Sequence, residues 1–86
     1  MHHEPMSPER VLAKRRAIGL RVRAAREYAN LTLEAVWIRS GIRITTISDI
    51  EQGHRAALID TLIKIADAIG VPLEGFVRED SEDSEE

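Results

Sequence analysis

Hydrophobic residues recur at helical spacing along most of the chain and divide it into short amphipathic segments. In the first segment they follow one another at intervals of seven, four, three and four residues: Val11, Ile18, Val22, Ala25 and Ala29. This is one stripe of an α-helix whose other sides carry arginines. Ser7 and Pro8 form a typical helix start, and Asn30 tolerates the left-handed conformation that ends a helix. Because Gly19 lies within the stripe, the pattern predicts either one long helix or two pieces that meet near this glycine.

Caps and glycines mark the further helices. Thr32 is a good N-cap for a helix over residues 33–40, and the glycine after that range supplies the turn into a helix over 44–52. Residues 59–69 are strongly amphipathic, and 73–77 suffice for one or two more turns. The apolar positions of the 59–69 helix are Ile59, Leu62, Ile63, Ala66 and Ile69. No segment of useful length alternates like a β-strand, so the sequence predicts an all-α fold, a compact bundle of four to five helices.

Length and composition limit the kinds of protein that the chain can be. It has 86 residues, enough for one small domain, and no cysteine, which excludes disulfides and thiolate metal sites. It has no catalytic-triad spacing, no glycine-rich phosphate loop and no cluster of metal ligands, so we expect no enzyme, cofactor, metal or small-molecule substrate. No apolar run approaches the ~18 residues of a membrane span, and the N-terminus lacks the apolar core of a signal peptide. We therefore expect a cytoplasmic protein without a membrane partner.

Charge is segregated along the chain. Seven basic residues and no acidic one lie from Arg10 to Arg26, whereas residues 79–86 contain six acidic residues and no basic one. Without that tail the net charge of −3 becomes +3 for the rest of the chain, which is compatible with a polyanionic partner. We interpret residues 1–9 as a flexible N-terminus, 10–78 as the folded domain and 79–86 as a disordered, solubilising tail.

The two helices on either side of Gly41 form a helix-turn-helix pattern, in which a short glycine-containing turn joins two helices. When this pattern binds DNA, the second helix enters the major groove and its N-terminal residues meet the base edges. The pattern alone is a weak signal, because many helical bundles contain such a corner. The surrounding segments are more specific: "RVRAAREYANLT" (21–32), "SGI" (40–42), "ISDIEQG" (47–53) and "DTLIKIADAIGVPL" (60–73).

With these segments, residues 18–76 resemble the Cro/C1-type (XRE) helix-turn-helix domain. The resemblance implies a lambda-repressor-like domain of five helices that binds double-stranded DNA, usually as a homodimer, and most often regulates transcription. It also implies an ion pair between Arg26 of the first helix and Glu51 of the third, which would tie the recognition helix to the scaffold. We expect this pair to be partly buried.

Three positions depart from the pattern of the family that the chain resembles. Leu33 stands where a glutamine usually hydrogen-bonds a phosphate, although the backbone N–H groups of this helix start still face one. Trp37 stands where a small alanine lets the two helices touch, so the indole must widen the corner or swing outward. We expect it to fill space between helices rather than to stack on a base. Arg43 replaces the usual Ser or Thr cap of the third helix and places a cation close to the DNA backbone.

The outward face of the third helix carries the candidate base-reading residues: Ile44, Thr45, Thr46 and Asp49. Each threonine can donate or accept one hydrogen bond, whereas Ile44 can contact only an apolar group such as the thymine methyl. Asp49 could accept from cytosine N4, or pair with a cation such as Arg43. Discrimination would therefore depend on methyl contacts and DNA shape more than on bidentate pairs.

Candidate phosphate-binding residues flank this helix or belong to the basic run of the first: Thr32, Arg43, His54, Arg55, Lys14, Arg15 and Arg16. Arg43 could also be bidentate to guanine. The lysine and two arginines at 14–16 could act as an extra phosphate clamp or be only the solvated face of a helix.

These observations predict a sequence-specific transcription regulator, a repressor, that binds DNA as a homodimer. One third helix would enter each of two successive major grooves, about 34 Å apart. We expect the dimer contact near the C-terminal helix, at apolar residues that are also the natural cap of the core: Ile69, Leu73, Phe76 and Val77. The alternatives are a protein-interaction module with weak DNA binding, and an antitoxin that also neutralises a toxin.

Overall fold

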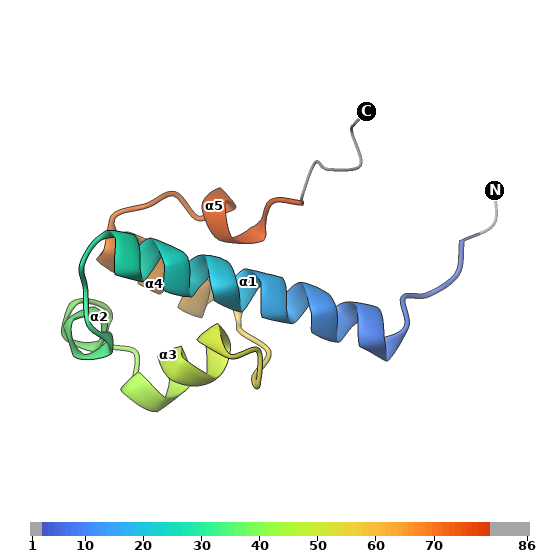
Figure 1. Cartoon of the computed structure of the whole chain (residues 1–86), viewed down its shortest axis with the longest axis horizontal. Helices are drawn as coiled ribbons and strands as arrows, with labels where there is room; N and C mark the ends of the chain where they lie inside the picture. The colour runs from blue at the N-terminus through green and yellow to red at the C-terminus, as the bar shows by residue number, and fades with distance from the viewer. Residues whose placement is uncertain (1–2, 80–86) are drawn as a thin grey trace.

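The computed structural model describes residues 3–79, which form five helices and no strand (Figure 1). The helices are α1 (Pro8–Tyr28), α2 (Leu33–Ser40), α3 (Ile44–Glu51), α4 (Ile59–Ile69) and α5 (Glu74–Val77). The long helix α1 is the centre of the bundle and contacts α3, α4 and α5, whereas α2 packs on α3 and α4. The predicted all-α fold is thereby confirmed. The acidic tail beyond Glu79 lies outside the described residues.

Helix α1 runs without a break through Gly19. The Ser7 hydroxyl caps its start by accepting a hydrogen bond from the backbone N–H of Arg10 at 3.2 Å, and Asn30 has a φ of 59° just beyond its end. Gly19 does not interrupt the helix; a glycine is needed there because of a close contact with α3. A Cβ atom at this position would lie 2.3 Å from the carbonyl oxygen of Ile50, so the absent side chain lets α1 and the end of α3 approach closely.

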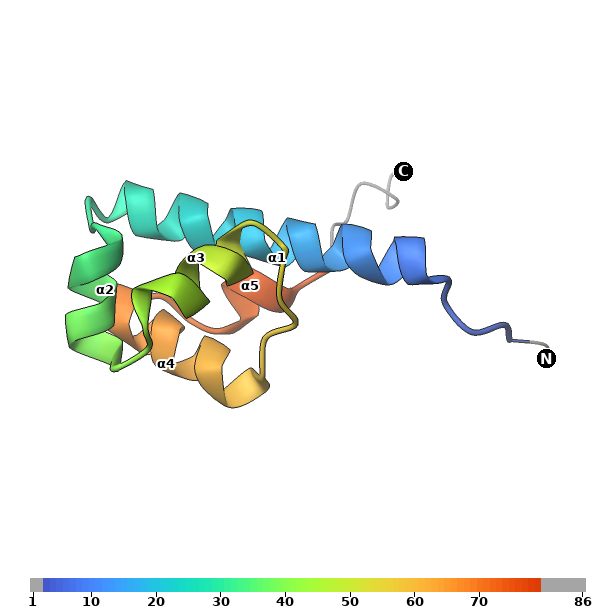
Figure 2. The same cartoon turned by 90° about the horizontal axis from the view of Figure 1, so that it is seen from below.

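The buried stripe of α1 is shorter than its apolar spacing predicts. Val22 is fully buried and Ile18 and Ala25 are partly buried against the core, but Val11 is 44% exposed and Ala29 is an exposed C-cap. The reason is that the N-terminal half of α1 reaches beyond the other helices (Figure 2). An apolar stripe is buried only where a second element covers it.

Helix α4 buries Leu62, Ala66 and Ile69 as predicted, but the other two predicted positions lie outside the core. Ile59 and Ile63 were expected on the buried side, yet they are 54% and 48% exposed, whereas Ile65 is fully buried. The helix is apolar on more than half of its circumference, so its spacing leaves several rotations possible, and packing on α1 and α2 selects one. The core consists of Val22, Val36, Ile47, Ile50, Leu62, Ile65, Ala66, Ala68, Ile69 and Phe76.

The C-terminal helix α5 closes the core on the far side of α1 from α3 (Figure 1). Phe76 is 1% exposed and Ile69 is 7% exposed, so these two belong to the interior of the single chain. The guanidinium of Arg21 on α1 donates to the carbonyl oxygens of Phe76 and Arg78 at 3.2 Å and 2.5 Å. The expectation that Phe76 and Ile69 contact a second copy is therefore corrected, since the monomer already covers both side chains.

Candidate nucleic-acid interface

The corner between α2 and α3 is built by local hydrogen bonds. The Thr32 hydroxyl accepts from the backbone N–H of Ala35 at 3.0 Å and caps α2. Gly41 ends α2 in the left-handed conformation, with a φ of 79°, and its N–H donates to the carbonyl oxygen of Trp37 at 2.7 Å. The Ser40 hydroxyl then accepts from the N–H of Ile42 at 3.0 Å. These bonds set a three-residue turn, so α3 begins close beside α2.

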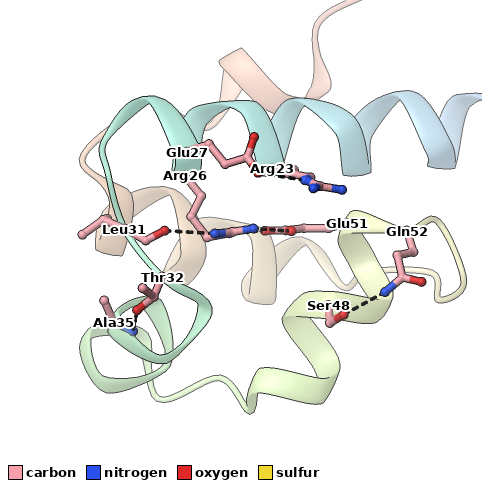
Figure 3. Close-up of polar contacts among 9 residues, drawn as sticks. All are labelled: Arg23, Arg26, Glu27, Leu31, Thr32, Ala35, Ser48, Glu51 and Gln52. Carbon is pink, nitrogen blue, oxygen red and sulfur yellow. Dashed lines mark hydrogen bonds and ion pairs between the residues drawn. The ribbon is translucent and has the colours of Figure 1, made fainter.

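Helix α3 is held on its inner side by apolar burial and by an ion pair (Figure 3). Ile47 and Ile50 are 0% and 2% exposed. Arg26 and Glu51 form the expected pair, with Nε–Oε2 and Nη2–Oε1 distances of 2.7 Å and 3.0 Å. The same guanidinium donates to the carbonyl oxygen of Leu31 at 2.9 Å. One arginine therefore joins the end of α1, the start of the α2 unit and the end of α3.

This pairing also acts on the protonation of the arginine. The hydrogen bonds to Glu51 raise the pKa of Arg26 above its ordinary value. A cation whose pKa is higher in the folded than in the unfolded state stabilises the fold at every pH below its unfolded-state pKa. This contribution is lost only as the pH rises through the folded-state pKa. The arginine side of the pair therefore contributes equally to stability throughout the neutral range.

The opposite face of α3 presents the predicted base-reading residues unequally. Ile44 and Thr45 are exposed at the first turn, whereas Thr46 and Asp49 are partly buried. Asp49 does not pair with Arg43; its Oδ2 lies 3.5 Å from Nη2 of Arg55. Asp49 thus pairs with a cation, which was one of the outcomes open from the sequence, and the cation is Arg55 from the segment after α3. The surface thus leaves two of the predicted base-reading side chains, Ile44 and Thr45, open to solvent, and the carboxylate of Asp49 is paired with a cation.

The sequence left open how Trp37 is accommodated at the corner. Trp37 is 42% exposed, and the fully buried residue of α2 is its neighbour Val36. Trp37 lines a hollow of about 360 Å³ with the first residues around α3: Arg43, Ile44 and Thr45. We call this the corner hollow. The side chain is therefore partly open to solvent at the corner, in agreement with the outward placement that was one of the two outcomes open from the sequence.

The structure brings the separate basic segments together at the other end of α3. Lys14, Arg15 and Arg55 line one hollow of about 320 Å³ between α1 and the segment 54–58. Arg16 packs against Gly53, where a Cβ would lie 2.6 Å from its Cγ. Three consecutive cations of α1 and one from the segment after α3 therefore gather near the end of α3.

Of the two remaining predicted phosphate contacts, His54 lies beside this basic group and Thr32 lies apart from it at the start of α2, and Lys14 of the group is already paired. His54 is exposed next to Arg55, and Thr32 is exposed at the start of α2. Lys14 Nζ lies 2.5 Å from Glu79 Oε1, the first residue of the acidic tail. The described start of the tail therefore reaches the basic run of α1.

Within residues 3–79, no helix is both long and apolar enough to cross a membrane. No group of three or more His, Asp or Glu side chains in that range is placed to hold a metal ion.

The anchored third helix, the glycine turn before it and the cations beside it define a helix-turn-helix domain. The Helix-turn-helix family model, of the Cro/C1 (XRE) type, matches residues 22–76, and the chain belongs to this family. Family membership supports a DNA-binding transcription regulator rather than an enzyme.

A solved structure with the same fold is the crystal structure of the restriction-modification controller protein C.AhdI from Aeromonas hydrophila. The two align with a TM-score of 0.72 and 23% sequence identity, over 74% of this chain and 97% of that chain. A search of curated proteins found no match. At this identity the likeness establishes the fold.

The missing cap of α3 leads to a testable prediction. Arg43 is the N-cap of α3 and makes no side-chain capping bond. We expect Arg43→Ser to be more stable than Arg43→Ala by about 1 kcal/mol, because serine can accept from a free N–H of the first turn. Urea unfolding followed by circular dichroism measures the difference. Both variants lose the same positive charge, so equal stabilities would show that α3 gains nothing from a cap.

Proposed function

We propose that the protein is a sequence-specific repressor that binds double-stranded DNA as a homodimer, with α3 of each copy in a major groove. One observation carries this proposal: α3 is fixed to the scaffold on one side by Ile47, Ile50 and Glu51, while its other side is open and bordered by cations. A rigidly held helix is what positions side chains on base edges. Cations at both ends of it supply the phosphate contacts that dominate affinity.

Each part of this surface has a distinct proposed role. Ile44, Thr45 and Thr46 read bases from the first turn of α3. Asp49 acts mainly by holding Arg55, to which it is paired at 3.5 Å. The phosphate contacts are the exposed and half-buried polar groups around α3: Thr32, Arg43, His54, Arg55, Lys14, Arg15 and Arg16.

The dimer contact is proposed on a smaller surface than the sequence suggested. Val77 is 38% exposed and Leu73 is partly buried, so these two remain available to a second copy, whereas the other two predicted residues do not. A repressor dimer on this surface would place its half-sites about one helical turn apart.

A binding titration tests the proposed function. Affinity is measured for random duplexes and for duplexes selected from a random pool, over a series of salt concentrations. A DNA regulator is expected to prefer the selected sequences and to lose affinity steeply as salt rises, since each phosphate contact releases counterions. If binding is absent even at low salt after removal of residues 79–86, the proposal fails and a protein-interaction module on the same fold becomes the better hypothesis.

Variants of α3 and its surroundings distinguish residues that contact phosphates from residues that contact bases. Arg43→Ala with Arg55→Ala is expected to weaken binding to all sequences and to lower the salt slope by about two, one for each lost phosphate contact. Thr45→Ala is expected to change the preferred base at one position at a cost of about 1 kcal/mol. The control is Lys64→Ala, an exposed cation of α4 outside the proposed interface. If the Lys64 variant weakens binding as much as the arginine pair, attraction by total charge explains the affinity instead.

A further inference from the structure

The corner hollow is unusual in its composition for a surface that is proposed to face DNA. It is lined by Trp37 from the middle of α2 and by Arg43, Ile44 and Thr45 around the first turn of α3. Trp37 is 42% exposed and Ile44 is 36% exposed. Two large apolar side chains from different helices therefore border one open depression at the end of α3 that reads bases.

The two apolar side chains, Trp37 and Ile44, limit which chemical groups can bind in the hollow favourably. An exposed indole and an exposed isoleucine are unfavourable in water and gain by being covered with apolar surface. Most base edges in the major groove are hydrogen-bond donors and acceptors, which would lose their water against the indole and the isoleucine without gaining a partner from either side chain. The apolar group in the major groove is the C5 methyl of thymine. Thr45 adds a methyl and one hydroxyl to the same lining, which suits the C5 methyl of thymine and the O4 carbonyl oxygen beside it.

Charge and position favour the same occupant. Arg43 also borders the hollow and adds a cation to its lining, which suits a base that carries its own phosphate. The first-turn residues of a recognition helix are those that meet base edges. A partner protein is not needed to explain the hollow, since a methyl-bearing base would arrive there with its own phosphate.

We propose that Trp37 is a specificity-determining residue which, with Ile44, encloses the C5 methyl group of a pyrimidine in the major groove. This inference rests on the proposed function and names the chemical group that the site reads. The occupant in unmodified DNA is thymine. Because 5-methylcytosine carries a methyl at the same ring position, a cytosine at that place in the site is read through its methylation state.

Replacement of thymine by uracil tests the proposal, because uracil lacks only the C5 methyl. A preferred duplex is first selected from a random pool with the full chain, and each thymine is then changed singly to uracil. At one thymine in each half-site, the change is expected to weaken binding roughly fourfold, the factor that burial of one methyl-sized group gives. At the same position, 5-methylcytosine is expected to bind more tightly than cytosine by a similar factor.

Variants of α2 assign the effect to the indole. In Trp37→Ala the thymine-to-uracil ratio is expected to fall from about four to about one, with little change in affinity for the uracil duplex. Trp37→Phe keeps an aromatic wall and should retain part of the ratio. The matched control is Ile38→Ala, because Ile38 is the next residue of α2, is 71% exposed and does not line the corner hollow. Its ratio should stay at that of the wild type.

The outcomes distinguish this inference from the proposed function. If no preferred duplex emerges from the selection, the proposed function fails and the inference falls with it. If a preferred duplex emerges but thymine and uracil bind alike at every position, only the inference is overturned. It is also overturned if the thymine-to-uracil ratio survives in Trp37→Ala, or if methylation of cytosine has no effect where thymine and uracil differ.

Discussion

Replacing Arg26 by leucine should lower the free energy of unfolding by about 3–5 kcal/mol, because it leaves one partner of a buried ion pair without the other. The side chain of Glu51 is only 5% exposed and that of Arg26 is 12% exposed. The variant also removes the donor of the Leu31 carbonyl oxygen. Since small domains are stable by about 5–15 kcal/mol in total, a large part of the stability depends on this arginine. Urea unfolding monitored by circular dichroism measures the loss.

Two controls separate burial from the mere loss of a charge. Arg23→Leu breaks the pair with Glu27 on the exposed side of the same helix, and a pair of this kind contributes about 0.3–0.5 kcal/mol. The double variant Arg26→Leu with Glu51→Leu leaves no charge buried alone and is expected to recover most of the lost stability. If the double variant is no more stable than Arg26→Leu, the loss comes from packing or from the Leu31 carbonyl rather than from the unpaired carboxylate.

Replacing Gly19 by alanine should destabilise the protein by about 3 kcal/mol, at the upper end of the usual cost of overpacking. The added methyl would lie 2.3 Å from the carbonyl oxygen of Ile50 and 2.6 Å from that of Glu51. Both are backbone atoms, so no side chain can rotate away and α3 itself must shift. Thermal and urea unfolding measure the loss. Because the displaced segment contains the end of the recognition helix, affinity for the selected duplex should fall as well.

The informative result is whether Gly19→Ala destabilises or stabilises the protein. In a helix without such a contact, glycine to alanine stabilises by up to about 1 kcal/mol, because alanine has the better helix propensity. The control is Gly75→Ala, since a Cβ at Gly75 in α5 meets no atom within 4 Å. This variant is expected to be neutral or slightly stabilising. If Gly19→Ala were as stable as Gly75→Ala, the close approach of α1 and α3 would be contradicted.

The sequence predicted which residues form most of the candidate interface, but it did not predict which contacts they make. The first turn of α3 follows from the glycine at position 41, and the resemblance to the Cro/C1 family pointed to the pair of Arg26 with Glu51. The partner of Asp49 was not foreseeable, because Arg55 reaches it only through the path of the segment after α3. The exposure of Trp37 was left open for a similar reason, because it depends on the packing of α2 that buries Val36.

The sequence by itself determined the helices and their ends, since these depend on hydrogen bonds between near neighbours in the chain. Ser7 and Thr32 cap α1 and α2, and Gly41 and Gly70 end α2 and α4 as the residue types predict. The tertiary structure alone decided which apolar side chains are covered. Packing between distant segments rotates α4 to bury Ile65, places Phe76 and Ile69 inside the monomer, and leaves the indole of Trp37 beside the first turn of α3. The spacing within one helix carries no information about these contacts, because each depends on the position of another helix.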